Sequence, residues 1–154
     1  MEEKFKLENQ LCFRLYTASR LITQAYHPLL EEFGLTYPQY LVLLVLWEKD
    51  QQPVNDIAKR LVLETNTVTP LLKRMETEGI VTRSQGEKDA RQTIVKLTKK
   101  GRDLQKKLID VPETVGNAVI CKSVTPETVP GLFCMLDDIT KQLKKYLNIV
   151  SPAR

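Results

Sequence analysis

The sequence predicts a mainly helical fold that contains one small antiparallel sheet. Two short segments with strand character, residues 80–84 and 93–97, are joined by a charged turn. Alternating side chains in such segments are typical of half-buried strands. The pair follows two short helical segments, residues 54–61 and 66–78, with a tight link between them. This order of helix, turn, helix and hairpin is typical of a winged helix-turn-helix.

Helical spacing of apolar residues predicts the elements around this unit. A long first helix covers residues 7–30. The next helix, residues 39–49 with Pro38 in its first turn, is apolar on most sides, so we expect it to be buried with Trp47 in the core. The expected capping residues are, in chain order, Gly34, Thr36 or Tyr37, Asn55, Thr65 or Asn66, Gly79 and Thr98.

Beyond the hairpin the chain is expected to be helical. A charged amphipathic helix covers residues 98–110, Pro112 interrupts or bends it, and a further helix starts near Thr125. This last helix has a long apolar stripe, which must pack either on the domain's own core or on a second copy; we expect a dimer interface. The stripe consists of Leu132, Met135, Leu136, Ile139, Leu143 and Leu147.

The 154 residues are expected to form one chain with two regions. Residues 38–97 form the winged helix-turn-helix region, and residues 1–35 and 98–154 form long N- and C-terminal helices of a dimerisation region. A hydrophobic content of 42% and a charged content of 27% are ordinary for a soluble protein. No apolar run reaches the roughly 18–20 residues of a membrane span, and the polar N-terminus does not resemble a secretory signal. We therefore expect a cytoplasmic protein with no membrane partner.

The positive charge of the chain lies in its middle third. Residues 54–108 carry 13 lysines and arginines against 7 aspartates and glutamates, whereas residues 1–53 have a net charge of −2 and residues 109–154 of 0. A local basic segment is expected of a nucleic-acid reader, although a solvated charged face is the alternative. Arg91, oriented by Asp89, is expected to reach the minor groove. The predicted DNA contacts are Thr65, Thr67, Thr69, Pro70, Lys73, Arg74, Lys88, Asp89 and Arg91.

Three cysteines and one histidine limit the chemistry of the chain. Cys12, Cys121 and Cys134 are too few and too scattered for a disulfide framework. No Cys-x-x-Cys pair accompanies His27, so we expect no metal site and no cofactor, with the histidine at the surface or at a helix end. Cys134 falls in the apolar stripe of the last helix and is expected to be buried in the core.

Cys12 is the candidate for redox chemistry. It lies in the first turns of the first helix, where the helix dipole favours a thiolate. Tyr16 and Tyr26 lie within roughly 40° of the same helix face, and a phenol O–H that donates to a thiolate favours that form over the thiol. Thiolates attack peroxides and become sulfenic acids. An isolated cysteine on such a helix is otherwise a small buried hydrophobe, and both interpretations stay open on chemistry alone.

Several segments resemble the MarR family of transcription regulators, and together they cover essentially the whole chain. Asp89-Ala90-Arg91 leading to Leu97-Thr98-Lys99-Lys100-Gly101 is similar to the family's wing signature. Residues 67–76, 11–16 and 35–40 are similar to the branch of organic-hydroperoxide-resistance regulators. The resemblance implies that Cys12 is the peroxide-sensing thiol. It also implies that Tyr26 and Tyr37, 14 and 25 residues further on, donate hydrogen bonds to this thiol from the partner subunit.

The predicted function is that of a dimeric DNA-binding regulator and not of an enzyme. The resemblance implies a repressor that releases a pseudo-palindromic operator when an organic hydroperoxide oxidises Cys12. In some similar regulators a second cysteine resolves the sulfenic acid as an inter-subunit disulfide, and Cys121 is the candidate; a small thiol is the alternative. The competing hypotheses are a repressor of the same family released by a small phenolic ligand without thiol chemistry, a peroxidase, and a protein-only interaction module.

Overall fold

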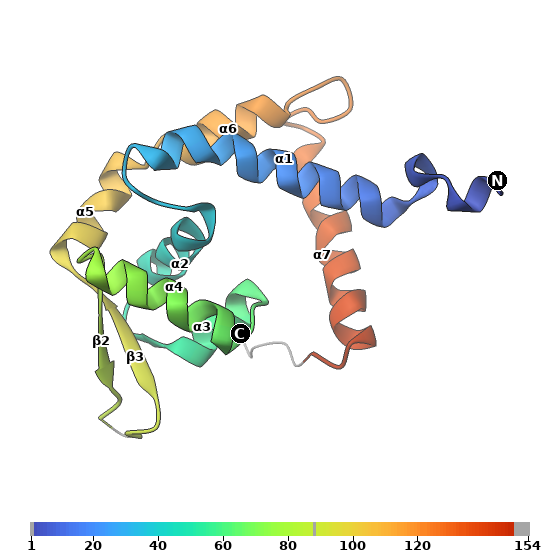
Figure 1. Cartoon of the computed structure of the whole chain (residues 1–154). Helices are drawn as coiled ribbons and strands as arrows, with labels where there is room; N and C mark the ends of the chain where they lie inside the picture. Colours follow the sequence, from blue (N-terminus) through green and yellow to red (C-terminus); the bar gives the residue numbers. More distant parts are fainter. Residues whose placement is uncertain (1, 88, 150–154) are drawn as a thin grey trace.

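The computed structural model describes residues 2–87 and 89–149, so the predicted DNA contact Lys88 lies outside the described residues. Figure 1 shows a helical molecule with one small sheet, which confirms the predicted fold class. The elements are α1 (Leu11–Glu31), α2 (Tyr37–Glu48), β1 (Gln52–Pro53), α3 (Val54–Leu61), α4 (Thr65–Thr77), β2 (Val81–Gln85), β3 (Thr93–Leu97), α5 (Lys99–Lys107), α6 (Val111–Val119) and α7 (Val129–Tyr146).

Helix α2 forms the centre of the core, with α1, α3, α4 and α5 packed around it. Thr36 is the N-cap of this helix. Its backbone N–H donates to the Gln39 side chain at 2.8 Å, as in a capping box. Trp47 is partly buried and packs against the core, and its indole N–H donates to Gly101 O at 2.9 Å. The buried apolar side chains of α2 are Tyr40, Val42, Leu43, Val45 and Leu46.

Helices α3 and α4 pack on each other and form the helix-turn-helix. Val62 ends α3 in the left-handed region at φ 54°, and a short extended link leads to α4. Two predicted caps are wrong. The residue before α3 is Pro53, and Asn55 lies inside the helix. The residue before α4 is Glu64, so Thr65 is the first helical residue rather than its cap.

The sheet has the order β1-β3-β2, and both pairs are antiparallel. In the hairpin Val81 lies opposite Leu97 and Gln85 opposite Thr93, close to the predicted strands. The two-residue strand β1 was not predicted. The hairpin ends on Thr98, whose side chain caps α5 by accepting from Gly101 N–H at 3.1 Å, as expected.

Glycines end two helices where the sequence predicts them. Gly34 follows α1 at φ 67° and Gly79 follows α4 at φ 69°, in the left-handed region that other residues rarely adopt. Gly101 is required for a different reason. A Cβ atom at this position would lie 2.3 Å from the carbonyl oxygen of Ile80, so α5 can approach β2 only with glycine there.

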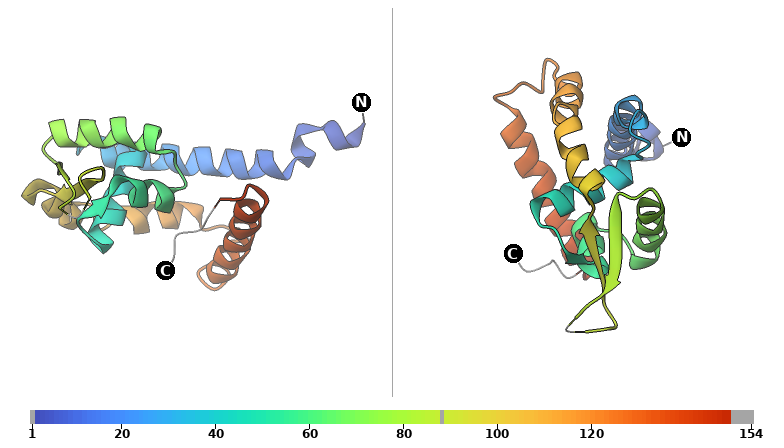
Figure 2. Two further views of the ribbon diagram at one scale, coloured as in Figure 1. Left: turned by 90° about the horizontal axis from the view of Figure 1, so that it is seen from below. Right: turned by 90° about the vertical axis from the view of Figure 1, so that its left-hand side faces the viewer.

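The terminal helices extend away from this core. Helix α1 begins at Leu11 and not at Leu7, because two short 3-10 turns, Glu3–Phe5 and Leu7–Asn9, precede it. The last helix begins at Val129 rather than near Thr125. Figure 2 shows the N-terminal half of α1 projecting beyond the winged region, with α7 on the same side. No residue of α7 is buried, and no helix in the described part of the chain is long and apolar enough to cross a membrane.

Candidate nucleic-acid interface and cysteine site

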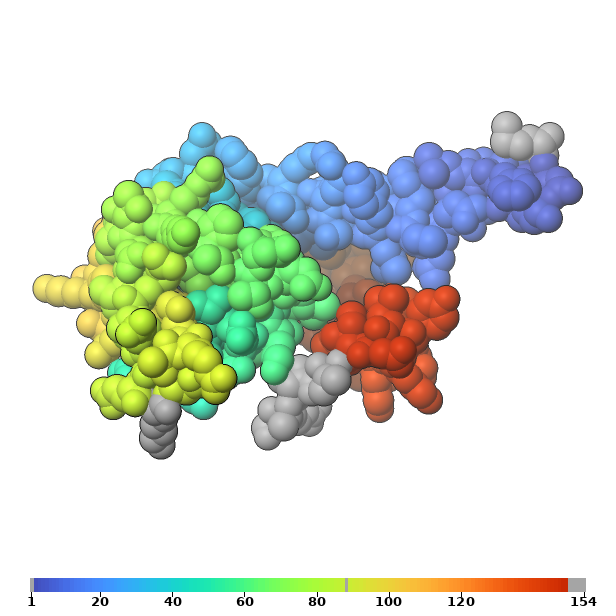
Figure 3. Space-filling model, turned by 60° about the horizontal axis from the view of Figure 1, so that its bottom comes forward, coloured from blue at the N-terminus to red at the C-terminus, as the bar shows by residue number. Residues whose placement is uncertain are grey.

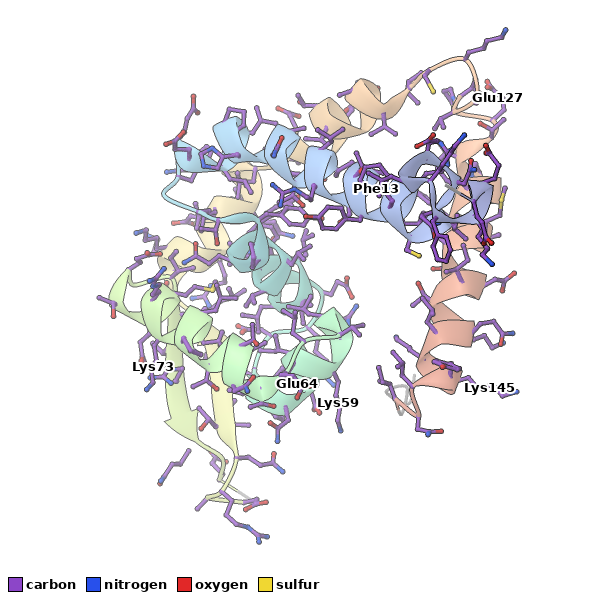
Figure 4. The ribbon with its side chains drawn as sticks, turned by 45° about the vertical axis from the view of Figure 1, so that its right-hand side comes forward. Phe13, Lys59, Glu64, Lys73, Glu127 and Lys145 are labelled. Atoms are coloured by element: carbon purple, nitrogen blue, oxygen red, sulfur yellow. The ribbon has the colours of Figure 1, made fainter. Side chains whose placement is uncertain are left out.

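One face of α4 is anchored in the core and the opposite face is exposed. Val68, Leu72 and Met75 are fully buried, and this fixes the rotation of the helix about its axis. At 3.6 residues per turn the outward face then carries residues spaced 4, 7 and 11 positions apart. Lys73 projects from this helix in Figure 4. The exposed residues on or beside this face are Asn66, Thr67, Pro70, Lys73, Arg74 and Thr77.

The predicted contacts of α4 divide into two groups. Thr67, Pro70, Lys73 and Arg74 are exposed on the outward side, whereas Thr65 and Thr69 lie on the flank that faces α3 and the wing. The Thr69 hydroxyl donates to Thr65 O at 2.8 Å. The Thr65 hydroxyl donates to Asn55 Oδ1 at 3.1 Å. Both hydroxyls thus have protein partners.

Sequence reasoning missed three polar residues of this surface. Asn66 and Thr77 lie 4 residues before and 7 residues after Pro70, so they share its face. The 3.6-residue period, counted outward from the buried positions, could have identified both. Asn55 was assigned to a helix cap, because a single sequence does not show that Thr65 lies next to it.

The wing tip is held by hydrogen bonds within its turn. Asp89 Oδ1 accepts from the backbone N–H of Arg91 at 3.0 Å and from its Nε at 3.2 Å, so the carboxylate orients the guanidinium as predicted. The Arg91 side chain is 92% exposed. Gln92 N–H donates to Asp89 O at 3.0 Å. Figure 3 shows α4 in green and the wing in yellow side by side on one face of the molecule.

A charged pair joins the wing to α4. Arg83 on β2 donates from Nε and Nη2 to Glu76 Oε2 at 2.9 and 2.7 Å, and its backbone N–H donates to Glu76 Oε1 at 3.0 Å. The side-chain hydrogen bonds from Arg83 hold the pKa of the Glu76 carboxyl below its usual value. Three hydrogen bonds from one residue fix the position of β2 relative to the helix.

Cys12 lies in the first turn of α1 with its side chain exposed. Tyr26 is 14 residues further along the same helix, which corresponds to roughly 21 Å at about 1.5 Å per residue. A hydrogen bond between the two within one protomer is therefore excluded. Tyr16 is exposed one turn away, and its hydroxyl accepts from Arg20 Nη1 at 3.2 Å.

Tyr26 and Tyr37 belong to an aromatic cluster where α1 crosses α2. Their ring centroids are 4.8 Å apart, and Tyr40, which the sequence analysis did not single out, lies 5.6 Å from Tyr26. Burial raises the pKa of Tyr26 and of Tyr37, and together with the neighbouring phenols it raises that of Tyr40 to about 12. All three phenols consequently keep their protons near neutral pH and are O–H donors.

The other cysteines lie in the C-terminal part. Cys121 is exposed in the loop after α6, where its N–H donates to Val124 O at 2.9 Å. Cys134 is exposed on α7, so its predicted burial in the core of the protomer is wrong. His27 is exposed and lies 3.6 Å from Glu31, as expected of a surface residue. Within residues 2–87 and 89–149 no group of three or more His, Cys, Asp or Glu is arranged to hold a metal ion.

Comparison with known proteins assigns the chain to a family. The family described as "Transcriptional regulator SarA/Rot" matches residues 24–108. The organic hydroperoxide resistance transcriptional regulator of Bacillus subtilis (strain 168) is 48% identical over 118 residues, which cover 75% of this chain and 80% of that relative. The regulator MgrA of Staphylococcus aureus is 37% identical over 119 residues, which cover 77% of this chain and 81% of MgrA.

Solved structures agree with this assignment. Reduced AbfR bound to DNA is 39% identical, with a TM-score of 0.73 over 92% of this chain and 98% of the other. AbfR of Staphylococcus epidermidis is 35% identical, with a TM-score of 0.75 over 94% and 96%. The MarR-type fold, the matched family and the identity to the Bacillus protein lead to one conclusion. The chain belongs to the MarR-like SarA/Rot family of transcriptional regulators, in the branch of the organic-hydroperoxide-resistance regulators.

Proposed function

We propose that the chain is a dimeric DNA-binding repressor that releases its operator when an organic hydroperoxide oxidises Cys12. The observation that carries the DNA-binding part is the shared exposed face of α4 and the wing. Lys73 and Arg74 on the helix and Arg91 on the wing all project from it, and none is used in the core. The related AbfR has been solved bound to DNA, which supports the same use of this face.

On DNA, α4 enters the major groove and the wing lies in the adjacent minor groove. The amide of Asn66 suits a base edge, and the ring of Pro70 suits the methyl group of thymine. Lys73 and Arg74 pair with phosphates or guanine. Arg91 enters the minor groove, where narrow A·T-rich segments attract arginine. Lys88 is proposed as a phosphate contact, because it is positively charged and lies next to Asp89 in the sequence.

Exposed apolar surface on the terminal helices supports a dimer. In α7 the side chains of Phe133 and Met135 are 61% and 63% exposed, and in α1 those of Leu11 and Leu21 are 62% and 58% exposed. Helices with such faces are marginal in water unless a partner covers the apolar side. Residues 1–35 and 98–154 are accordingly proposed as the dimerisation region, with a two-fold axis that matches a palindromic operator.

The dimer also completes the thiol site. Because roughly 21 Å of helix separate Cys12 from Tyr26 in one protomer, the hydrogen bonds to the thiol must come from the tyrosines of the second protomer. Tyr26 and Tyr37 keep their protons near neutral pH and lie ring against ring, so they present two phenol donors at one place. Donation to sulfur favours the thiolate. Tyr16 lies one helical turn from Cys12 and is exposed beside the thiol.

The proposed reaction is a two-electron oxidation of sulfur. The Cys12 thiolate attacks the terminal oxygen of the hydroperoxide, which carries the hydrogen, so an S–O bond forms as the O–O bond breaks. Sulfur is oxidised to a sulfenic acid, and the peroxide is reduced to an alkoxide that takes a proton from water and leaves as the alcohol. A second thiol then attacks the sulfenic sulfur, which forms a disulfide and releases water.

Cys121 is proposed as that second thiol, with a small cellular thiol as the alternative. Its side chain is exposed in the loop between α6 and α7, so it is accessible to a sulfenic acid on another protomer. The intact thiol site lies against α2 through the tyrosine cluster, and α2 packs on α3 and α4. A displacement of α1 on oxidation would therefore change the separation of the two recognition helices, α4 of each protomer, and release DNA.

The test is DNA binding under defined redox conditions. An operator would first be selected from a random duplex library with the reduced protein. Anisotropy titrations would then compare the reduced, hydroperoxide-treated and re-reduced protein, with non-reducing gels and intact masses on the same samples. We expect reversible release in the wild type and a covalent dimer that needs Cys121. Binding that is indifferent to hydroperoxide would contradict the sensing mechanism and favour release by a small ligand.

A further inference from the structure

A small notch separates the recognition helix α4 from the wing, which is the β2–β3 hairpin. It has a volume of about 150 Å³ and is bordered by α3, α4, β2 and β3. Its walls combine two guanidinium groups with amide and hydroxyl groups, and no carboxylate is among the described lining residues. The polar residues that line it are Asn55, Thr65, Thr69, Arg83, Arg91, Gln92 and Thr93. A concave site that offers only cations and neutral polar groups suits an anion.

Two donors of the notch are held in place by hydrogen bonds to other side chains of the protein. The Thr65 hydroxyl donates to Asn55 Oδ1 at 3.1 Å, so the oxygen of this amide is engaged. Within the described residues no hydrogen bond uses Asn55 Nδ2, which leaves its two N–H groups to donate. Arg83 Nε and Nη2 bind Glu76 Oε2, whereas Nη1 makes no hydrogen bond among the described residues. Thr65 and Glu76 therefore position these donors without occupying them.

The notch lies where a winged helix must cross a DNA strand. If α4 is in the major groove and the wing in the adjacent minor groove, the sugar-phosphate backbone that separates these grooves runs between the two elements. We propose that the notch binds one phosphodiester of that backbone in each half-site, with Asn55 Nδ2 and Arg83 Nη1 as its principal donors. This inference rests on the proposed DNA binding and assigns a phosphate subsite within it.

Replacement of Asn55 by aspartate tests the subsite with minimal change of shape. Asn55→Asp retains an oxygen that can accept from Thr65. Asn55 is the second residue of α3, where the helix dipole favours a negative charge, so the fold should remain intact. A carboxylate in the notch repels a phosphate. Gln105→Glu, an exposed amide-to-carboxylate change on α5, is the matched control.

The assay is an anisotropy titration on the selected operator at fixed salt, repeated with single phosphates replaced by neutral methylphosphonates. We expect Asn55→Asp to weaken binding at least 100-fold and Gln105→Glu less than threefold. Wild-type binding should weaken about tenfold when one particular phosphate of a half-site is neutralised. Neutralising that same phosphate should strengthen the binding of the Asn55→Asp variant to the operator. Arg83→Gln should reduce the slope of log K against log salt by about 1 per half-site.

The outcomes separate the notch from the proposed function. A wild-type protein that binds no duplex, even at low salt, overturns the proposed DNA binding and this inference with it. Wild-type binding with an equally tight Asn55→Asp variant overturns the notch alone. So does an Asn55→Asp variant that is weakened but rescued by no methylphosphonate position, because its defect would then not involve one phosphate. Circular dichroism of each variant checks that the fold is intact.

Discussion

Gly101→Ala should destabilise the protein although alanine is the better helix former. An added Cβ would lie 2.3 Å from Ile80 O and 3.0 Å from Leu97 Cδ2. Ordinary contacts of this kind are near 3.4 Å or longer. Helix α5 must therefore move about 1 Å away from β2, since the obstacle is a backbone carbonyl that cannot rotate aside.

The displacement acts on a small set of hydrogen bonds. Thr98 N–H donates to Ile80 O at 3.0 Å, the Thr98 hydroxyl donates to Gly79 O at 2.7 Å, and Trp47 Nε1 donates to Gly101 O at 2.9 Å. Each contributes about 1 kcal/mol. Helix propensity returns about 1 kcal/mol. The expected net loss is therefore about 2 kcal/mol, or roughly 4–8 °C in Tm for a chain of this size.

Urea and thermal denaturation followed by circular dichroism would measure this loss at one protein concentration. Gly116→Ala in α6 is the matched control, because no atom lies within 4 Å of its added Cβ. We expect that variant to be unchanged or stabilised by up to about 1 kcal/mol. If Gly101→Ala were as stable as Gly116→Ala, the close approach of α5 to β2 would not be the reason for glycine at position 101.

Three further predictions concern the wing, the thiol and the tyrosine cluster. Arg91→Ala should weaken DNA binding about tenfold or more per half-site and leave the free energy of unfolding within about 0.5 kcal/mol, because its side chain is 92% exposed; unchanged affinity at fixed salt would contradict its role. Cys12→Ser should bind DNA normally but ignore hydroperoxide, and a serine variant that still dissociated would exclude sensing through this residue. Burial raises the pKa of Tyr40 from 10.0 to about 12, so the folded state holds the proton more tightly. The stability that this residue contributes should be complete below pH 10 and should fall between pH 10 and 12, as urea midpoints would show; Tyr40→Phe should flatten that fall.

Local signals in the sequence predict the winged region well. The glycines at positions 34 and 79 end their helices, Thr98 caps α5, and the hairpin lies within a residue of the predicted strands. These features depend on contacts between neighbours in the chain, so a single sequence carries them. The two wrong caps have a common cause. The side chains of Asn55 and Thr65 bond to each other across the helix-turn-helix rather than to their own backbones.

Long-range relations account for what the sequence analysis missed. Strand β1 has only two residues and exists because Gln52 and Pro53 pair with Val95 and Ile94 on β3. The burial of Cys134 was expected because it falls in an apolar stripe, but within the described residues Cys134 is exposed and no residue of α7 is buried. An apolar pattern shows that a surface is to be buried; it does not distinguish the chain's own core from a second copy.

In the proposed mechanism, helix α2 is the element that links the thiol site to the DNA-binding surface. In the proposed dimer the thiol contacts tyrosines on α1 and at the start of α2, whereas the proposed DNA contacts lie on α4 and the wing. Tyr40 packs with Tyr26 and Tyr37 at one end of α2, and the side of this helix is buried against α3 and α4. Close-packed interiors transmit displacements rather than absorb them. A change at the tyrosine cluster is therefore expected to move the recognition helix α4 as a rigid unit. The wing is joined to α4 through Arg83 and Glu76 and is expected to move with it.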